Sequence, residues 1–154
     1  RALNDAIMNM IDLVDDPRIV AGGGAIEEEI SRQIRLASGR LSGKEQLAYL
    51  AFADAVESIP RTLAENAGLE PVEIMAQLRH AHENGGRTVG VNIFGGGVAD
   101  MFKTGVIEPA KVKIHALRSS FEAASMVLRI DDVVAATRKK EEKKKEGETE
   151  TPEF

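Results

Sequence analysis

The sequence contains no cysteine and no tryptophan, and only 4% of its residues are aromatic. Without cysteine the chain forms no disulfide, has no thiolate nucleophile and builds no cysteine-ligated zinc site. The lack of cysteine is also compatible with a reducing cytoplasm, where we expect the protein to reside. With so few aromatic residues, the core must be built from Ala, Ile, Leu, Val and Met, a composition that favours packed helices.

Long apolar runs and excess positive charge are also lacking. No segment approaches the ~18 consecutive apolar residues that span a bilayer, and the first residues are amphipathic rather than apolar like a signal peptide. The net charge of −5 argues against a general nucleic-acid-binding protein. Since 43% of the 154 residues are hydrophobic, the chain is long and apolar enough for one domain with a core. We therefore expect a globular domain that binds neither nucleic acid nor membrane.

Apolar residues recur every three to four positions over most of the chain, which is the spacing of amphipathic helices. Ser42 followed by Glu45 is a capping-box pattern, and Pro60 suits the first turn of a separate helix. The segment that starts at Pro109 is expected to be the longest helix. Helices are expected over residues 3–14, 26–38, 42–56, 60–66, 71–81 and 109–128.

A few segments carry strand or coil patterns instead. Residues 87–94 are typical of a strand and 95–97 of its turn, while 98–102 fit either the partner strand or a short helix. Residues 129–135 are typical of a terminal strand. Residues 137–154 are rich in Lys and Glu and almost free of apolar side chains, so we expect this tail to be disordered. The sequence therefore predicts a mainly α fold with a small β-hairpin and a C-terminal strand.

Three consecutive glycines, Gly22, Gly23 and Gly24, come directly before the helix that starts near Ile26. Bare backbone N–H groups and the positive end of a helix together suit a polar or anionic ligand at close range. A glycine-rich turn is also an ordinary tight connection, and both interpretations remain open. The three acids at 27–29 complement the helix dipole and otherwise suit a solvated helix start.

Three further polar residues are candidates for binding or catalysis, each with an ordinary structural alternative. Asp5 can orient a water that attacks a phosphoryl group, or it is a solvated helix residue. Asn92 can present its amide to a base, or its side chain bonds the adjoining turn. Glu108 can accept hydrogen bonds from a ribose, or it caps the helix that Pro109 opens.

The histidines do not form a metal-binding pattern. His80 and His82 are two residues apart, so on a helix they point in different directions, whereas helical zinc pairs are spaced by three or four. We expect surface histidines and no metal site within this sequence.

Several specific strings occur in order along the chain. They are Arg-Ala-Leu-Asn-Asp-Ala (1–6), Ile-Val-Ala-Gly-Gly-Gly-Ala (19–25), Ala-Asp-Ala (53–55), Ile-Pro-Arg-Thr-Leu-Ala-Glu-Asn-Ala-Gly (59–68), Gly-Val-Asn-Ile (90–93), Gly-Val-Ile-Glu-Pro (105–109) and Leu-Arg-Ile-Asp-Asp (128–132). Together they resemble the second half of group II chaperonin subunits, the family of the archaeal thermosome and its eukaryotic cytosolic relatives. The resemblance covers residues 1–136 at family-like spacing, and the tail adds nothing to it.

The resemblance implies a cytoplasmic, ATP-dependent chaperone. Subunits of that family assemble with one another into two stacked rings, eight- or nine-fold, which close around unfolded protein as ATP is hydrolysed. Residues 1–18 would belong to the intermediate domain, which links the ATP site to the lid. Residues 19–136 would form the C-terminal half of the helical equatorial ATPase domain, with the terminal strand joining a sheet between subunits.

The resemblance also assigns roles to residues of this sequence. Asp5 matches the carboxylate that positions the attacking water, and Glu108 matches the carboxylate that holds the ribose. The remaining matches are to backbone that contacts the nucleotide (Gly22, Gly23, Gly24) and to positions beside the adenine (Asn92, Ile93).

The sequence departs from the family pattern in two ways. The family's Gly-Asp-Gly-Thr-Thr phosphate loop, with its metal-binding carboxylate, does not occur here, and neither does the apical domain that holds clients. Gly95–Gly97 also replaces a more polar turn. We therefore expect the chain to carry part of an ATP site, with the Mg²⁺ ligand elsewhere, and not to hydrolyse ATP by itself.

Two alternatives from other classes accompany this hypothesis. The first is a helical module that associates with copies of itself and binds no nucleotide, because an isolated half-domain exposes surface that its partner segment would cover. The second is a dinucleotide-binding domain, against which stand the single glycine triplet and the lack of repeated strand–helix units.

Overall fold

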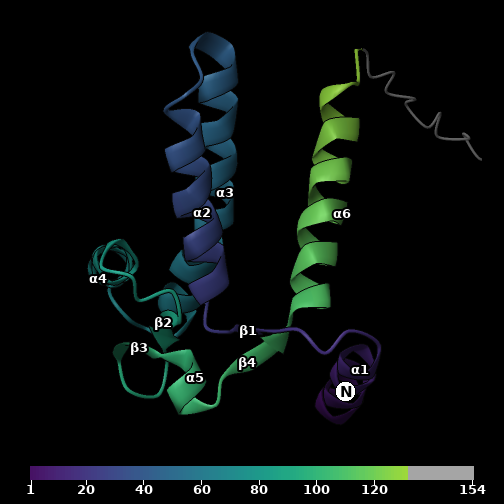
Figure 1. The fold of residues 1–154 in the computed structure, drawn as a ribbon, viewed down its shortest axis with the longest axis vertical. Coiled ribbons are helices and arrows are strands. Elements are labelled where there is room, and N and C mark those ends of the chain that lie inside the picture. Colours follow the sequence, from purple (N-terminus) through teal and green to yellow (C-terminus); the bar gives the residue numbers. More distant parts are fainter. Residues whose placement is uncertain (132–154) are drawn as a thin grey trace, which may run out of the picture.

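The computed structural model describes residues 1–131, which form a mainly α-helical fold with two short antiparallel β-ladders (Figure 1). The elements are α1 (Ala2–Asp15), β1 (Ile19–Ala21), α2 (Ala25–Ser38), α3 (Gly43–Asn66), α4 (Pro71–Glu83), β2 (Val89–Asn92), β3 (Gly97–Asp100), α5 (Met101–Thr104), β4 (Ile107–Pro109) and α6 (Ala110–Leu128). The expected mainly α fold and its hairpin are confirmed. Most of the expected terminal strand and all of the charged tail lie outside the described residues.

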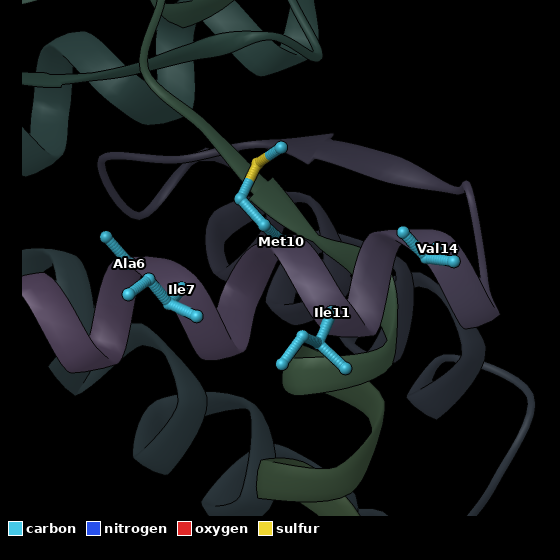
Figure 2. Close-up of a pocket in the computed structure, with 5 residues that line it drawn as sticks. All are labelled: Ala6, Ile7, Met10, Ile11 and Val14. Carbon is cyan, nitrogen blue, oxygen red and sulfur yellow. The ribbon is translucent and has the colours of Figure 1, made fainter.

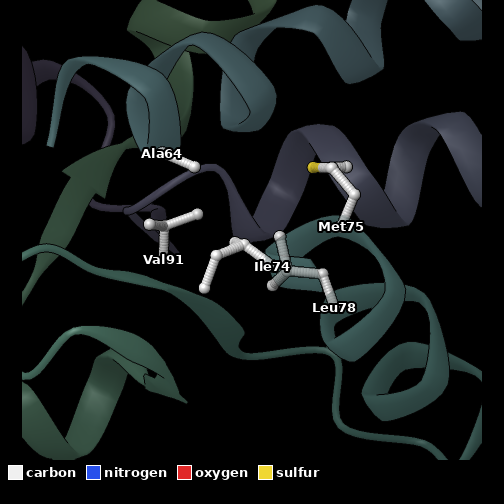
Figure 3. Close-up of a cluster of buried hydrophobic side chains, with 5 residues drawn as sticks. All are labelled: Ala64, Ile74, Met75, Leu78 and Val91. Carbon is white, nitrogen blue, oxygen red and sulfur yellow. The ribbon is translucent and has the colours of Figure 1, made fainter. Parts of the chain in front are cut away.

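Helices α2 and α3 stand side by side as a long pair, and α4 packs at their base with the β2–β3 hairpin (Figure 1). The main hydrophobic cluster forms where these elements meet. Burial of a large apolar side chain stabilises the fold by roughly 1.5–3 kcal/mol, so this small cluster is a main source of stability. Its buried members are Ala64, Ile74, Met75, Leu78 and Val91 (Figure 3).

A second ladder joins segments that are far apart in the sequence. Strand β1 pairs antiparallel with β4, so that Ile19 lies opposite Pro109 and Val20 lies opposite Glu108. Both strands have only three residues, too short to show strand periodicity in the sequence. This ladder brings the start of α6 next to the end of α1 and places Glu108 beside the glycine triplet.

Buried charge also holds the helices together. Glu57 of α3 is 1% exposed, and its carboxylate accepts hydrogen bonds from Arg35 of α2 and Arg79 of α4. A buried carboxylate is strongly unfavourable unless it is paired in this way. Removal of either arginine would leave one oxygen of the buried Glu57 carboxylate without its charged partner at the junction of three helices.

His82 is buried at the same junction, so the expectation of surface histidines is wrong at this position. Its Nε2 lies 2.8 Å from the carbonyl oxygen of Val89 and its Nδ1 lies 3.1 Å from Glu29. Each ring nitrogen therefore lies within hydrogen-bond distance of an oxygen of another element. His82 therefore ties the hairpin to α2 through α4, a role that its spacing from His80 does not reveal.

The expected break at Pro60 is also wrong, because α3 runs through Pro60 and, at 24 residues, is longer than the 19-residue α6. An internal proline loses one backbone hydrogen bond. Buried neighbours on both sides, Val56 and Ala64, hold the helix together across that position. Tertiary packing overrides the local signal here.

Two helix starts differ from their sequence patterns. Ser42 is the N-cap of α3, but its side chain makes no capping hydrogen bond. Gly43, the first helical residue, has a φ of +66°, so the backbone there lacks the regular first turn that a capping box needs. Pro109 is the N-cap of α6 rather than its first residue, because it is still extended and paired with Ile19 in the β-ladder.

Helix α6 stands apart from the α2–α3 pair along most of its length (Figure 1). Phe52 of α3 and Phe121 of α6 make an edge-to-face contact with ring centroids 6.4 Å apart. Much of the apolar surface of α6 remains exposed, at Ile114, Phe121, Met126, Val127 and Leu128. Within residues 1–131, none of the helices combines the length and the hydrophobicity that crossing a membrane requires.

Candidate functional site

The glycine triplet forms a tight turn between β1 and α2. Gly23 and Gly24 have φ values of +62° and +77°, which favour glycine over any residue with a side chain. The Gly22 N–H donates to the Val106 carbonyl at 3.0 Å, and the Gly23 carbonyl accepts from the Val91 N–H at 2.8 Å. The turn is therefore held between the β4 segment on one side and the β2–β3 hairpin on the other.

The three glycines lack side chains for different reasons. A Cβ at Gly24 would lie 2.6 Å from Pro60, and a Cβ at Gly23 would lie 2.7 Å from Met101, so both positions are filled by packing. A Cβ at Gly22 would instead lie 3.0 Å from the Oε1 atom of Glu108. Only Gly22 therefore lies against a candidate binding side chain.

The backbone of the turn has unused hydrogen-bonding groups. Among the described residues, no hydrogen bond is donated by the N–H of Gly23 or Gly24. These amides precede the first turn of α2, where the helix dipole favours negative charge. Gly24 is buried and Gly23 is half-buried, so the Gly23 amide is the one available to an anionic or polar ligand.

Glu108 lies beside this turn and is held by an ion pair. Its side chain is 35% exposed, and its Oε2 lies 2.7 Å from the Nζ of Lys113. The same Nζ lies 2.7 Å from Glu27 at the start of α2. Burial lowers the pKa of Lys113, but the hydrogen bonds that its ammonium donates to the two carboxylates outweigh burial and raise the pKa above its usual value. The lysine therefore remains charged between two acids.

The acids at the start of α2 do not form the solvated helix start that was one interpretation. Glu27 and Glu28 are each only 3% exposed, and Glu27 Oε2, Glu28 Oε2 and Ser31 Oγ have no hydrogen-bond partner among the described residues. Burial, followed by the nearby Glu57 carboxylate, raises the pKa of Glu28. By contrast, hydrogen bonding, chiefly from Arg32, lowers the pKa of Glu29 to about 2.

Asn92 uses its side chain within its own turn. Its Oδ1 accepts hydrogen bonds from the N–H groups of Phe94 and Gly95, at 3.2 and 3.0 Å. This is an Asx-type turn, the ordinary role expected for Asn at that position. Its neighbour Ile93 is 45% exposed and lines a hollow of about 280 Å³ with Leu63, Asn66, Ala67 and Phe94.

Asp5 lies on the exposed surface of α1. The hydrogen bonds and ion pairs of the described residues include none from its side chain, and none that joins it to Gly22 or Glu108. Another face of α1 carries an apolar stripe along a shallow hollow of about 330 Å³, which lacks the polar groups that a nucleotide needs. Figure 2 shows the lining residues Ala6, Ile7, Met10, Ile11 and Val14.

The structure thus brings Gly22 and Glu108 into contact and joins the triplet to β2 next to Asn92, but it does not join Asp5 to them. Sequence reasoning missed Lys113, which belongs to no motif. It lies at the start of α6 and forms its ion pair with Glu108 there. A carboxylate beside a glycine turn fits a polar ligand, whereas Ile93 lines a hollow whose walls include neither Glu108 nor the glycine triplet. Residues 1–131 contain no cluster of three or more His, Asp or Glu that could hold a metal ion.

The described residues define a mainly helical domain in which a glycine turn meets a strand-borne carboxylate. Residues 1–138 match the model of the TCP-1/cpn60 chaperonin family. The chain therefore belongs to the TCP-1/cpn60 chaperonin family.

Named relatives agree with this assignment. The chain is similar to a thermosome subunit of Methanopyrus kandleri, 53% identical over 136 residues that span 88% of this chain and 25% of that protein. It is similar to a thermosome subunit of Pyrococcus horikoshii, 52% identical over 148 residues that span 96% of this chain and 27% of that protein. The chain thus spans about a quarter of the length of these relatives.

A solved structure supports the fold. The chain resembles the open-state monomer of a group II chaperonin from Methanococcoides burtonii, with a TM-score of 0.78 and 45% sequence identity. The match covers 84% of this chain and 32% of that one. The expected fold of a chaperonin equatorial domain is thereby confirmed.

Proposed function

We propose that this chain supplies the nucleoside-binding side of the ATP site of a group II chaperonin subunit. The observation that carries the proposal is the contact between Gly22 and Glu108, which puts an acceptor carboxylate against a turn with free amides. Family membership supports it, because chaperonins of this type are ATP-dependent.

Each candidate residue has a proposed role in that site. Glu108 accepts hydrogen bonds from the ribose, and the free amide of the half-buried Gly23 faces the phosphates, which a helix start favours. Ile93, which is half exposed beside an apolar hollow, packs against the adenine. Because the Asn92 side chain bonds its own turn, its contribution is to hold Ile93 in place.

The chain's place in a whole subunit is also a proposal. Residues 1–18 correspond to the intermediate domain, and residues 19–136 to half of the equatorial domain. In that setting the subunit assembles with others into a double ring in the cytoplasm and encloses unfolded protein. The terminal strand joins a sheet between subunits in this proposal.

Nucleotide binding by the chain is tested by thermal unfolding with ADP or ATP and magnesium. A ligand at about 100 times its dissociation constant stabilises the folded state by about 2.7 kcal/mol. We expect stabilisation of the wild type and a clear loss of it in Glu108→Gln. No shift at millimolar nucleotide in the wild type would contradict the proposal.

Hydrolysis is a separate matter. No residue motif here holds the γ-phosphate or Mg²⁺, so the chain alone should bind nucleotide without turning it over. Phosphate release is the measurement, with Asp5→Ala as the comparison. Substantial, Asp5-dependent turnover by the chain alone would show that this division of roles is wrong.

A second candidate function is self-association through apolar helix faces without nucleotide. It is favoured by exposed apolar residues on α1, which include Leu3, Ile7, Met8, Met10, Ile11 and Val14. Patches of this kind mark interaction surfaces. Light scattering checks it: oligomers with no response to nucleotide favour this candidate, and a clean monomer counts against it.

A further inference from the structure

Lys113 occupies an unusual position for a lysine. It lies in the first turn of α6, where the helix dipole disfavours positive charge. Its side chain is only 20% exposed. A lysine at a half-buried helix start requires strong compensating contacts, and Glu27 and Glu108 supply them at 2.7 Å each.

These contacts fix the orientation of the Glu108 carboxylate. Its backbone is held in the β1–β4 ladder opposite Val20. Its Oε2 is bonded to Lys113, while its Oε1 faces Gly22. Because the Glu27 side chain is buried and shares the same Nζ, the lysine itself is held in place from α2. Oε1 is therefore the oxygen presented on the side of the glycine turn.

We propose that Lys113 is a positioning residue for ribose recognition: together with Glu27 it holds Glu108 so that Oε1 can accept a hydrogen bond from a ribose hydroxyl. This inference rests on the proposed nucleotide site and adds a residue that no motif identifies. Lys113 does not touch the nucleoside. It acts by removing the freedom of the carboxylate that does.

A neighbouring lysine provides the matched control. Lys111 lies two residues earlier on the same helix and also bridges two acids, Asp12 and Asp15, at 2.9 and 3.1 Å. Those acids belong to α1, and Lys111 makes no ion pair with Glu108 among the described residues. Loss of Lys111 removes an ion-paired lysine of the same helix turn without freeing the Glu108 carboxylate.

The test compares adenosine with 2′,3′-dideoxyadenosine, which lacks both ribose hydroxyls. Both are titrated into the ¹⁵N-labelled 154-residue chain and followed by amide NMR shifts, which detect millimolar binding. The wild type should prefer adenosine by about tenfold, the effect of one hydrogen bond to a charged acceptor. Lys113→Met should lose most of this preference while its affinity for dideoxyadenosine stays within about twofold of wild type. Lys111→Met should keep the preference.

A purely structural lysine would alter stability but leave the ratio of the two affinities unchanged. Because Lys113→Met leaves Glu27 buried and unpaired, Lys113→Met/Glu27→Gln is measured as well, and the same loss of preference is expected. If both variants keep the wild-type ratio while Glu108→Gln loses it, the inference is wrong and the proposed function stands. A wild type that shows no response to adenosine overturns the proposed function and this inference with it.

Discussion

The chain has two glycine triplets, Gly22–Gly24 and Gly95–Gly97, and the structure uses them in opposite ways. In the first, every missing Cβ would lie within 3.0 Å of a neighbouring segment. In the second, only Gly95 is crowded, by the Asn92 side chain of its own turn, while Gly96 and Gly97 border open space. The first triplet is glycine because of long-range packing, and the second because of local turn geometry.

This contrast shows that three glycines in a row carry no fixed meaning. The first triplet joins elements from the whole chain: Pro60, Met101 and Glu108 all lie against it. The second closes a hairpin whose strands would pair with other turn residues. Substitutions in the first triplet should therefore destabilise the fold more than substitutions in the second.

The largest effect is expected from Gly24→Ala. The new methyl group would lie 2.6 Å from Pro60, at a φ of +77°. Steric overlap and backbone strain together should cost about 3 kcal/mol or more of unfolding free energy, measured by urea denaturation. Gly96→Ala is the matched control, because it has a φ of +72° but its nearest neighbour is 4.0 Å away. It should cost only about 1 kcal/mol, and equal losses would remove the contrast.

Acid should weaken the helix that follows the first triplet. The pKa of Glu29 is lowered to about 2, chiefly by hydrogen bonding from Arg32, so its stabilisation is present above about pH 4.5 and is lost as pH falls toward 2. We expect a loss of about 2 kcal/mol over that range after allowance for screening. Urea unfolding from pH 6 to about pH 2.5 measures it.

Glu29→Gln is the comparison for that titration. Glu28 acts in the opposite direction, since its raised pKa means that its protonation favours the folded state. The difference between wild type and Glu29→Gln isolates the Glu29 contribution. A difference that does not shrink as the pH falls would contradict the assignment.

Gly22→Ala should have an intermediate effect. Its φ is not positive, so the cost comes only from contacts with Val106 at 2.9 Å and Glu108 at 3.0 Å. We expect about 1–2 kcal/mol of destabilisation and weaker nucleotide binding, because the Glu108 carboxylate must move. In a double-mutant cycle, Val106→Ala should recover part of the stability; full additivity would indicate that the Val106 contact is not the cause.

Asn92→Ala should cost about 1 kcal/mol, since it removes the acceptor of two hydrogen bonds in the second turn. Asn92→Asp keeps an acceptor oxygen and should stay within about 0.5 kcal/mol of wild type. Thermal unfolding of the three proteins distinguishes them. An equal loss in both variants would mean that the turn depends on the amide nitrogen instead.

The smallest effect is expected from Gly97→Ala, which has open space around it and no positive φ. The change should stay within about 0.5 kcal/mol of the wild type. Urea denaturation is again the measurement. A loss approaching that of Gly22→Ala would show that the second triplet is also held by long-range contacts.

Much of the fold could be predicted from the sequence because the helices are strongly periodic. The hairpin was predictable as well, and the choice between strand and helix after Gly97 is resolved as β3 followed by α5. The β1–β4 ladder could not be predicted, because strands of three residues are too short to show the alternation of apolar and polar residues. Their pairing also depends on contacts between distant segments. Continuity of α3 through Pro60 was missed for a similar reason: packing, not propensity, decides it.

The candidate site divides in the same way. Motif resemblance selected Gly22 and Glu108, and the structure brings them into contact. Nothing in the sequence indicated that Glu27 and Glu28 are buried, because three acids in the first turn of a helix are usually solvated. The role of Lys113 could not be predicted from the sequence. Its ion pairs join α6 to the start of α2 and to strand β4, and these elements meet only in the folded chain.

The β1–β4 ladder has a mechanical consequence. Helix α1 enters the ladder at the Ile19 end, and α6 leaves it at the facing Pro109 end, so both helices attach at the same edge. A force that separates α1 from α6 therefore breaks the hydrogen bonds of the ladder one residue pair at a time, starting at Ile19 and Pro109. It does not shear all three pairs together. The ion pairs from Lys111 to Asp12 and Asp15 join α6 to α1 directly, so they would break before the residue pairs of the ladder.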